Sequence, residues 1–574
     1  MVLFIIGSVT ILNLDMGTHP PPPGPPKHGH SHRQPPNPPI VPKNVKAKDN
    51  EKYNNKRETT STTTDTSTKY TTQKPATEPT NFDKTESKNP TKKRLDVGLD
   101  SNSFEINNPY NKIDKVYKEN EKQNQQRASK VRDAMKFAWD NYVKYNWGGD
   151  ELRPITKGDH DWFSLGLTII DSLDTLYIME LHQEFDKAKD WIKNDLDLAK
   201  NTRHSVSVFE TIIRFLGGFL STYHLSGDQV FLDKAEQMGH LLLKAFDGKS
   251  PFPKTYLHLS DGNARYEDAH CVILAQIGTL FLEFNHLSEV TGNPIWKHTS
   301  DKALNALASM KTKYPGLIPS KVKQDASGFC EDHYSIAAMT DSYYEYLLKM
   351  WIYQDKTNSQ YKDLYNTAAK SALEYLYKQT TKGDYYMANF INGHPTSTQE
   401  HLACFTGGMF ALGAAANVSE SEEMNEFYME AGKQITATCA KTYFNMPTGV
   451  GPEVAGFSSD GSIYAQVQYY ILRPETVESL FILYRLTGDT KYQEWAWRIF
   501  EAIEKNCKTE NGYSGLRDVG SPHSKDDLQE SFFMAETLKY LYLIFKDSSV
   551  IPLDKYVFNT EAHPFPIQFD YVQK

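Results

Sequence analysis

Three short segments of this chain each place a glycine where a helix would end, and their spacing restricts the possible folds. They are Leu-Ser-Gly-Asp at 225–228, Val-Thr-Gly-Asn at 290–293 and Leu-Thr-Gly-Asp at 486–489. A glycine just beyond the last turn takes the left-handed conformation that closes a helix, and a new helical pattern follows each segment. The first two glycines lie 65 residues apart and the third lies 196 further along, close to three such steps. The chain therefore reads as a repeat of helix pairs.

A repeat of this length predicts a closed ring. Thr357-Asn358 stands where a further junction is due, and helical periodicity covers most of the chain after residue 110, for example Asp341–Tyr353 and Pro474–Leu486. Roughly 460 folded residues divided by about 65 give about seven helix pairs. The predicted fold is all-α, a toroid of helix pairs with one helix of each pair lining the axis. An unclosed helix bundle is the alternative.

Five acidic residues lie inside stretches that are otherwise apolar and helical: Glu210, Asp341, Glu475, Glu478 and Glu536. Burying an unpaired carboxylate costs several kcal/mol, so such groups need a partner, a metal or a water-filled site. On the inner helices of a toroid they would converge on a central cavity. The sequence therefore predicts a pocket lined with carboxylates.

Each acid also has a simpler explanation when it is considered alone. Glu210 and Arg214 are four residues apart, the spacing of an ordinary ion pair on one helix face. Glu475 and Glu478 follow Pro474 at a helix start, where negative charge complements the helix dipole. From the sequence pattern of each acid alone, both explanations stay open.

The remaining composition excludes several functions. With 63 Lys+Arg against 72 Asp+Glu the chain has no basic surplus for nucleic acid. It contains no phosphate-binding loop, dinucleotide fingerprint, serine-hydrolase elbow or His-Glu-x-x-His zinc motif. Carboxylates, aromatic residues, Arg and His remain, which suit glycoside hydrolysis, where one carboxyl protonates the leaving oxygen and another activates water.

The first hundred residues differ from the rest. We expect residues 1–16, with the apolar run Val2–Leu14, to be a worn or truncated signal anchor that attaches the chain to a membrane; the alternatives are an uncleaved signal peptide and a chance apolar start. Residues 17–107 are rich in Pro, His and Thr and should form a disordered stem, which leaves 108–569 as the catalytic domain. The sequon at Asn417 agrees with a secretory location. Whether Met1 is the true start, and whether the anchor spans the membrane, stays open.

A set of motifs carries a family resemblance that covers about residues 130 to 566. In chain order they are FAWDNYVKYNWGGDELRP, LGLTIIDSLDTLYIMEL, VSVFETIIRFLGGFLSTYHLSGD, DSYYEYLLK, HLACF, TGVGPE, LRPETVESLFILYRLTGD, ESFFMAETLKYLYLIF and FNTEAHP. This chain resembles the class I α-1,2-mannosidases, glycoside hydrolase family 47. The resemblance implies an (α/α)7 barrel and a calcium-dependent hydrolase, in agreement with the seven-pair prediction.

The resemblance also implies roles for four acids. Glu210 matches the family's acid that protonates the leaving oxygen, and Asp341 is a rival for that role. Glu475 matches the base that activates water, and Glu453 matches a further acid of the site. Because these enzymes invert the anomeric centre, the resemblance implies an acid and a base ~6.5–9.5 Å apart.

A calcium site is implied by the last motif. Thr560 matches the residue that holds the ion through its carbonyl and hydroxyl oxygens. Calcium accepts ~6–8 oxygen ligands, so water and sugar hydroxyls would complete the sphere. Glu478, Glu536 and Glu561 would order those waters.

Further matches concern the substrate and the cysteines. By resemblance the mannose pocket is lined by Arg214, His401, Arg473, Phe532 and Glu536. The family's structural disulfide matches Cys404 and Cys439, while Cys271, Cys330 and Cys507 have no assignment.

Two departures concern specificity. Met339 stands two residues before Asp341, where enzymes of the endoplasmic-reticulum type carry an Arg. Arg makes fixed, multidentate contacts with sugar hydroxyls, so its loss should loosen selection among glycan branches, as in Golgi-type enzymes. Gln276 stands at a position where the family commonly has a Glu.

Taken together, these matches predict a monomeric enzyme that removes terminal α-1,2-linked mannose from high-mannose N-glycans, lumenal in the Golgi or the endoplasmic reticulum. The alternatives are a degradation-targeting mannosidase-like protein of glycoprotein quality control and a catalytically dead mannose lectin. Which of the two organelles holds the chain, which branch is cut first, and whether Glu210 or Asp341 donates the proton stay open.

Overall fold

The structure is a computed structural model that describes residues 109–199 and 204–567. The predicted signal anchor and stem, residues 1–16 and 17–107, lie outside the described residues. Within the two described ranges, no helix is both long enough and apolar enough to cross a membrane.

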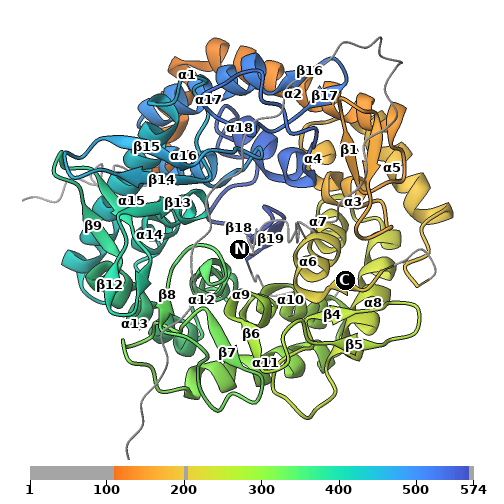
Figure 1. The fold of residues 1–574 in the computed structure, drawn as a ribbon. Coiled ribbons are helices and arrows are strands. Elements are labelled where there is room, and N and C mark those ends of the chain that lie inside the picture. Colours follow the sequence, from red (N-terminus) through yellow and green to blue (C-terminus); the bar gives the residue numbers. More distant parts are fainter. Residues whose placement is uncertain (1–108, 200–203, 568–574) are drawn as a thin grey trace, which may run out of the picture. The chain divides into compact units, whose positions relative to one another are not determined.

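Helices alternate along the chain between an inner and an outer layer, and the two layers form a ring around a central axis (Figure 1). The inner helices are buried on almost every side, whereas outer helices such as α5 bury one face only. In chain order the inner layer consists of α3 (Leu167–Asp171) with α4 (Leu173–Ile178), α6 (Val208–Glu210) with η1 (Thr211–Leu216) and α7 (Gly217–Ser226), α9 (Leu274–Gly278) with α10 (Phe281–Thr291), α12 (Asp341–Tyr353), η3 (His401–Cys404) with α14 (Phe405–Ala415), α16 (Glu475–Thr487), and η4 (Phe533–Thr537) with α18 (Leu538–Leu543).

The outer layer provides one partner for each inner unit. Its members are α2 (Glu121–Tyr145), α5 (His182–Asn194), α8 (Gln229–Leu242), α11 (Ile295–Ser309), α13 (Ser359–Tyr375), α15 (Glu422–Phe444) and α17 (Lys491–Asn506). The last inner helix, α18, packs against the first outer one, α2, and so closes the ring. Two short helices, α1 (Pro109–Glu119) and η2 (Leu243–Ala245), complete the helical elements of the described chain. The described part of the chain thus confirms the predicted (α/α)7 barrel.

The glycine junctions close inner helices as predicted. Gly227, Gly292 and Gly488 follow α7, α10 and α16 with φ of 73°, 71° and 66°. Near the ends of α4 and α14 the same left-handed conformation is taken by Glu180 and Asn417, each with φ of 57°. Non-glycine residues adopt this region uncommonly. The repeat was therefore only partly visible in the sequence.

The junction predicted near Thr357-Asn358 is present as well. After α12, Asp355 and Lys356 take positive φ, and the side chain of Asn358 accepts a hydrogen bond from the amide of Gln360 as α13 begins. A side-chain acceptor at this position satisfies one of the free amides of the first helical turn.

Short antiparallel sheets accompany the helices, and several of their strands lead directly into inner helices. Their short strands carry too little alternation to be recognised in the sequence. By sheet, they are β1 (Glu151–Arg153) and β2 (Gly158–His160); β3 (Val206–Ser207), β4 (Tyr256–Leu257) and β5 (Ala264–Arg265); β6 (Cys271–Ile273) and β7 (Lys321–Lys323); β8 (His333–Tyr334), β11 (Phe390–Ile391) and β12 (His394–Pro395); β9 (Tyr377–Gln379) and β10 (Tyr385–Met387); β13 (Thr398–Glu400), β14 (Val454–Phe457) and β15 (Ile463–Val467); β16 (Lys508–Thr509) and β17 (Gly512–Tyr513); and β18 (Tyr556–Phe558) and β19 (Pro564–Pro566).

The β18–β19 hairpin occupies the centre of the ring (Figure 1) and packs against α12 and α7. Its turn is anchored by His563, whose ring nitrogens lie 2.8 Å from Asp174 and 3.3 Å from Asp171. Lys539 of α18 lies 2.9 Å from Asp174 and donates a hydrogen bond to the carbonyl of Ala562. All four charged side chains are buried, and a buried charge is tolerated only when it is paired and hydrogen-bonded. Their mutual pairing therefore holds the turn at a fixed place in the barrel.

Close contact between α14 and its neighbours depends on two glycines. A Cβ atom at Gly407 would approach the hydroxyl oxygen of Thr436 to 2.1 Å, and one at Gly408 would approach Ile482 to 2.8 Å. Ser479 of α16 accepts a hydrogen bond from the amide of Gly408 and donates one to the carbonyl of Cys404. This packing brings the start of α14 against the start of α16.

Candidate active site

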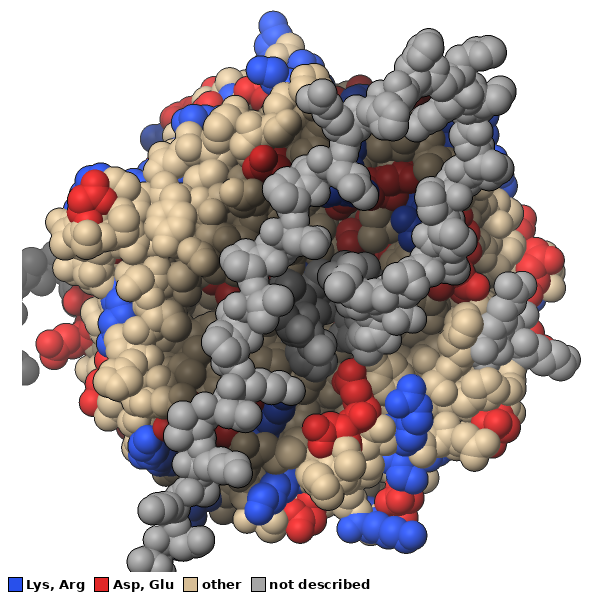
Figure 2. All heavy atoms as spheres, in the orientation of Figure 1, with Lys and Arg blue, Asp and Glu red and all other residues tan. Residues whose placement is uncertain are grey.

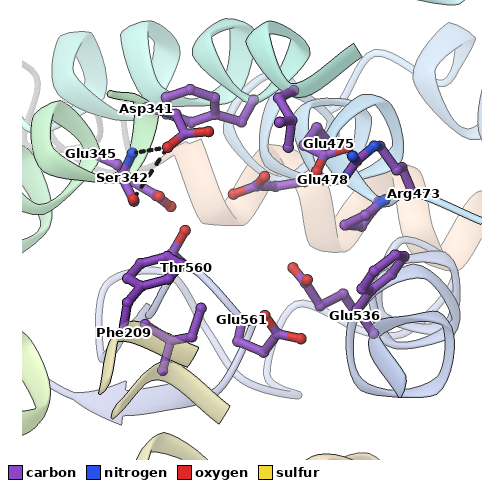
Figure 3. Close-up of a pocket in the computed structure, with 15 residues that line it drawn as sticks. Phe209, Asp341, Ser342, Glu345, Arg473, Glu475, Glu478, Glu536, Thr560 and Glu561 are labelled. Carbon is purple, nitrogen blue, oxygen red and sulfur yellow. Dashed lines mark hydrogen bonds between the residues drawn. The ribbon is translucent and has the colours of Figure 1, made fainter. Parts of the chain in front are cut away.

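A pocket lies at the axis of the barrel, and acidic side chains dominate its polar lining. Asp341 of α12 and Glu475 of α16 lie on one side, and Thr560, Glu561 and Glu536 lie across from them (Figure 3). In Figure 2 the face of the ring is hollowed near its centre, with acidic atoms visible in the hollow. The lining residues are Phe209, Ile213, Asp341, Ser342, Glu345, Leu402, Phe405, Arg473, Pro474, Glu475, Glu478, Phe532, Glu536, Thr560 and Glu561.

Glu475 is the first residue of α16 and is held by His401. Its Oε2 lies 2.7 Å from Nδ1 of His401, and Nε2 of that ring lies 2.6 Å from the hydroxyl of Tyr443. Burial opposes ionisation of Glu475, but the hydrogen bond from His401 and the charges of His401 and Arg473 outweigh it and lower the pKa of the carboxyl. Glu475 is therefore ionised at neutral pH, the state that a base requires.

Arg473 and Glu453 form a bidentate ion pair beside Glu475. Nε and Nη2 of Arg473 each donate to a different oxygen of Glu453, both at 2.7 Å. Glu453 immediately precedes β14, and its carbonyl accepts a hydrogen bond from the amide of His401. A bidentate ion pair of this kind fixes the guanidinium plane. Arg473 is therefore a rigid part of the pocket wall.

Asp341 has the opposite protonation state to Glu475. It is the first residue of α12, and its Oδ1 accepts a 2.8 Å hydrogen bond from the amide of Ser342. Burial, with repulsion from Glu345 and Glu400 added to it, raises the pKa of Asp341 to about 8. Asp341 therefore carries a proton at neutral pH, and it lines the same pocket as the ionised Glu475.

Glu210 lies just outside the lining and is fixed by Arg214. Nε of Arg214 donates to Oε2 of Glu210 at 2.7 Å, while Oε1 of Glu210 has no hydrogen-bond partner among the described residues. The same guanidinium donates to Ser531 at 3.0 Å and to Glu561, and it stacks 5.7 Å from the ring centre of Phe532. The ion pair expected from the four-residue spacing is present. It is also one part of a buried network that reaches the pocket.

The hairpin turn places Thr560 among carboxylates. Burial and then repulsion from Glu345 and Glu475 raise the pKa of Glu478 to about 8, although Lys349 opposes the shift. For Glu536, burial and the charges of Glu475 and Glu478 raise the pKa well above its usual range. The positive charges of Lys349, near Glu478, and Arg214, near Glu536, are therefore too little to offset burial and mutual repulsion.

A divalent cation would supply more positive charge, so the residues present fit one. No group of three or more His, Cys, Asp or Glu side chains among residues 109–199 and 204–567 is arranged to hold a metal directly. The oxygens of Thr560, water and ligand oxygens would have to provide the coordination.

Met339 is not part of the lining. Its side chain packs against an apolar cluster that includes Phe209 and Ile213, which do line the pocket, and Ile273 and Ala275. Its φ of 75° is left-handed, and its carbonyl accepts a hydrogen bond from the amide of Ala275. The structure thus places the partly exposed Met339 against the apolar residues that form this wall of the pocket.

Two disulfides are present. Cys404–Cys439 matches the predicted pair and ties the start of α14 to α15. Cys271–Cys330, which the motifs left unassigned, ties β6 to the loop that leads to β8. Cys507 is buried and free.

Several contributors to the site were missed at the sequence level. Asp171, Asp174 and Glu283 are acids inside apolar helical stretches, the same signal that selected the five acids discussed above. Lys349, which bonds Glu345 and lies 3.9 Å from Glu478, carries no comparable signal because a Lys in a helix is usually exposed.

The arrangement defines a class of protein. An α/α toroid whose axial pocket holds an ionised carboxyl among others whose pKa values are raised, with aromatic and guanidinium groups beside them, is suited to general acid and general base catalysis on a glycosidic bond. These features are those of a glycosidase.

Comparisons with known proteins make the assignment specific. The model of glycosyl hydrolase family 47 matches residues 134–567. The mannosyl-oligosaccharide alpha-1,2-mannosidase IA of Drosophila melanogaster is 42% identical over 456 residues, which cover 77% of this chain and 68% of the relative. The human mannosyl-oligosaccharide 1,2-alpha-mannosidase IB is 41% identical over 456 residues, covering 77% and 70%.

A solved structure agrees with the sequence relatives. The alpha-1,2-mannosidase from Trichoderma reesei superposes with a TM-score of 0.72 at 30% identity and covers 77% of this chain and 99% of its own. This chain belongs to glycosyl hydrolase family 47.

Proposed function

We propose that this chain hydrolyses terminal α-1,2-linked mannose residues of high-mannose N-glycans, with inversion at the anomeric carbon and with calcium bound at Thr560. The observation that carries the proposal is that Glu475, bonded to His401, and the buried Asp341 line one pocket, where the pKa of the first is lowered and that of the second is raised. The relatives named as mannosyl-oligosaccharide 1,2-alpha-mannosidases support the choice of substrate.

The chemical step needs two proton transfers, one to the glycosidic oxygen and one from the attacking water. An acid on the Asp341 side protonates the glycosidic oxygen while the bond from that oxygen to the anomeric carbon breaks. Glu475 takes a proton from a water whose oxygen bonds the carbon from the opposite face. His401 and Arg473 keep Glu475 ionised and oriented for this step. Solvent then restores the proton to the acid and removes it from Glu475.

Two residues compete for the role of proton donor. Asp341 lines the pocket and is held protonated by burial. Glu210 lies outside the lining, bonded to Arg214, and its second, buried oxygen has no hydrogen-bond partner in the described part of the chain, so a water there could relay a proton. The structure favours Asp341, and the two are separable by experiment.

When bound, calcium would supply a Lewis-acidic centre that holds sugar hydroxyls. The carbonyl and hydroxyl of Thr560 would bind it, with Glu478, Glu536 and Glu561 ordering its waters. The raised pKa values of Glu478 and Glu536 support this assignment, because a cation would relieve the repulsion that contributes to them. Arg214, Arg473, Phe532 and Glu536 would form the mannose pocket around it.

The relatives support the substrate, and the location is proposed with it. We assign the chain to the secretory pathway, lumenal in the Golgi or the endoplasmic reticulum, as a monomer attached to the membrane through residues 1–16. The sequon residue Asn417 is exposed, which suits a lumenal domain. Met339, packed on the apolar wall, supports a Golgi-type enzyme that accepts several branches.

A hydrolysis assay tests the proposal. Wild-type protein should release mannose from a nine-mannose glycan, lose activity with a calcium chelator and recover it with added calcium. Glu475→Gln should bind the glycan but lose turnover by about three or more orders of magnitude, whereas the exposed Glu501→Gln is the matched control. Activity that persists in chelator would refute the calcium assignment. Binding without turnover by the wild type would instead support a lectin.

The proton donor is identified with α-mannosyl fluoride, because fluoride leaves without protonation. If Asp341 is the donor, Asp341→Asn should lose activity on glycan but keep most of its activity on the fluoride, and Glu210→Gln should not show this contrast. The reverse pattern would assign the proton to Glu210 and its water.

A further inference from the structure

One peptide group of the hairpin turn is held at both ends by α12. The carbonyl of Asn559 accepts a hydrogen bond of 3.3 Å from Nζ of Lys349. The amide of Thr560, at the other end of the same peptide bond, donates one of 3.4 Å to the hydroxyl of Tyr346. Because a peptide group is planar, two bonds at opposite edges fix the direction of its plane.

Both bonds are long, but their α12 partners are themselves fixed. The hydroxyl of Tyr346 donates to Oε1 of Glu283 on α10 at 2.6 Å, and the side-chain amide of Asn559 donates to the same oxygen at 2.8 Å. Glu283 and Tyr346 are both fully buried. One carboxylate oxygen therefore joins the turn to two inner helices.

Asn559 transmits this restraint along the turn. Its side-chain amide also donates to the carbonyl of Ile213 at 2.9 Å. Its Oδ1 accepts from the amides of Glu561 and His563, at 2.9 and 2.8 Å. Every bond of the Asn559 side chain is thus used, and the backbone on both sides of Thr560 is fixed.

We propose that Tyr346 and Glu283 are positioning residues, which orient Thr560 so that its carbonyl and hydroxyl oxygens face the axial pocket. The consequence for calcium rests on the proposed function. If Thr560 binds the ion, these two residues set its affinity without touching it. Residues that orient a metal ligand in this way typically change metal affinity by about 10–100-fold when they are replaced.

The test compares two tyrosines of the same helix. Tyr346→Phe removes the hydroxyl that joins Thr560 to Glu283. Tyr353→Phe is the control, because its buried hydroxyl lies on α12 and bonds Glu289 and His286 instead. Glu283→Gln is a second variant that keeps the size of the side chain and weakens its bonds to both partners.

The first measurement is hydrogen–deuterium exchange of residues 556–566 without calcium. Tyr346→Phe should exchange at least about tenfold faster than wild type in this segment, Glu283→Gln should also exchange faster, and Tyr353→Phe should match wild type. Each tenfold corresponds to about 1.4 kcal/mol in the opening equilibrium, which is within the range of about 0.5–1.5 kcal/mol for an intramolecular hydrogen bond.

The second measurement is titration of the chelator-treated proteins with calcium chloride. Tyr346→Phe should weaken calcium binding by about 10–100-fold, and Tyr353→Phe by less than about threefold. Unchanged exchange in Tyr346→Phe, or equal acceleration by both tyrosine variants, overturns the proposal. If wild-type protein bound no calcium, the metal assignment would fail, while the exchange comparison would still decide whether Tyr346 and Glu283 position the turn.

Discussion

Replacing His401 with alanine removes the hydrogen bond that keeps Glu475 ionised, and this should move the acid limb of the pH–activity profile upward. In the structure Nδ1 of His401 lies 2.7 Å from Oε2 of Glu475, and the contact is partly buried. Burial alone would raise the pKa of Glu475, so without His401 the balance shifts toward the protonated form.

The size of the shift follows from the strength of the bond. A hydrogen bond to a charged group contributes about 1.5–3 kcal/mol. One pKa unit corresponds to about 1.4 kcal/mol, which converts to about one to two units. As the proposed base, Glu475 acts when ionised, so activity should be lost as the pH falls through its pKa. A higher pKa therefore moves the acid limb upward by about one to two pH units.

The assay is kcat/KM against pH on α-1,2-linked mannobiose, with His401→Asn as the control. An Asn side chain can place an amide donor near the position of Nδ1 and should keep much of the effect. The basic limb should stay in place, because His401 contacts neither Asp341 nor Glu210. If His401→Ala and wild type shared the same acid limb, the assignment of Glu475 as the base would be refuted.

Three further predictions concern Asp341, Met339 and the disulfides. Because burial raises the pKa of Asp341 to about 8 and we propose that Asp341 acts while protonated, activity of the wild type should fall as the pH rises through about 8, and the pH profile of kcat/KM measures this limb. Met339→Arg should narrow the products toward a single eight-mannose isomer, seen by chromatography of released glycans; an unchanged product profile would count against a specificity role. Mild reductant should open Cys271–Cys330 before the other disulfide, because Cys330 is exposed whereas both cysteines of the other pair are buried; alkylation followed by peptide mass mapping would show the order.

The ring of helix pairs could be predicted from the sequence because its junctions carry a physical signature. Glycine is favoured where φ must be positive, so Gly227, Gly292 and Gly488 marked three helix ends. Glu180 and Asn417 take the same conformation near the ends of α4 and α14 without that signature. The prediction of α12 matched both ends, since all of its residues are buried and the pattern is continuous.

The site could be predicted only in part. Acids on apolar helices indicated a carboxylate pocket, but nothing local shows that Asp341 and Glu475 differ in protonation, which depends on His401 from a distant segment. Thr560 lies in a hairpin with no periodicity, and only the family resemblance pointed to it. Its place in the pocket depends on long-range bonds such as that between Asn559 and Glu283.

The most direct test of the central claim is proton NMR of the first sugar released from α-1,2-mannobiose by the wild-type protein. Acid and base on opposite faces of the sugar predict that β-mannose appears first and converts to the α anomer only by mutarotation. Glu475→Gln should release no mannose on the same timescale. Initial release of α-mannose, or no release from this linkage, would contradict the account.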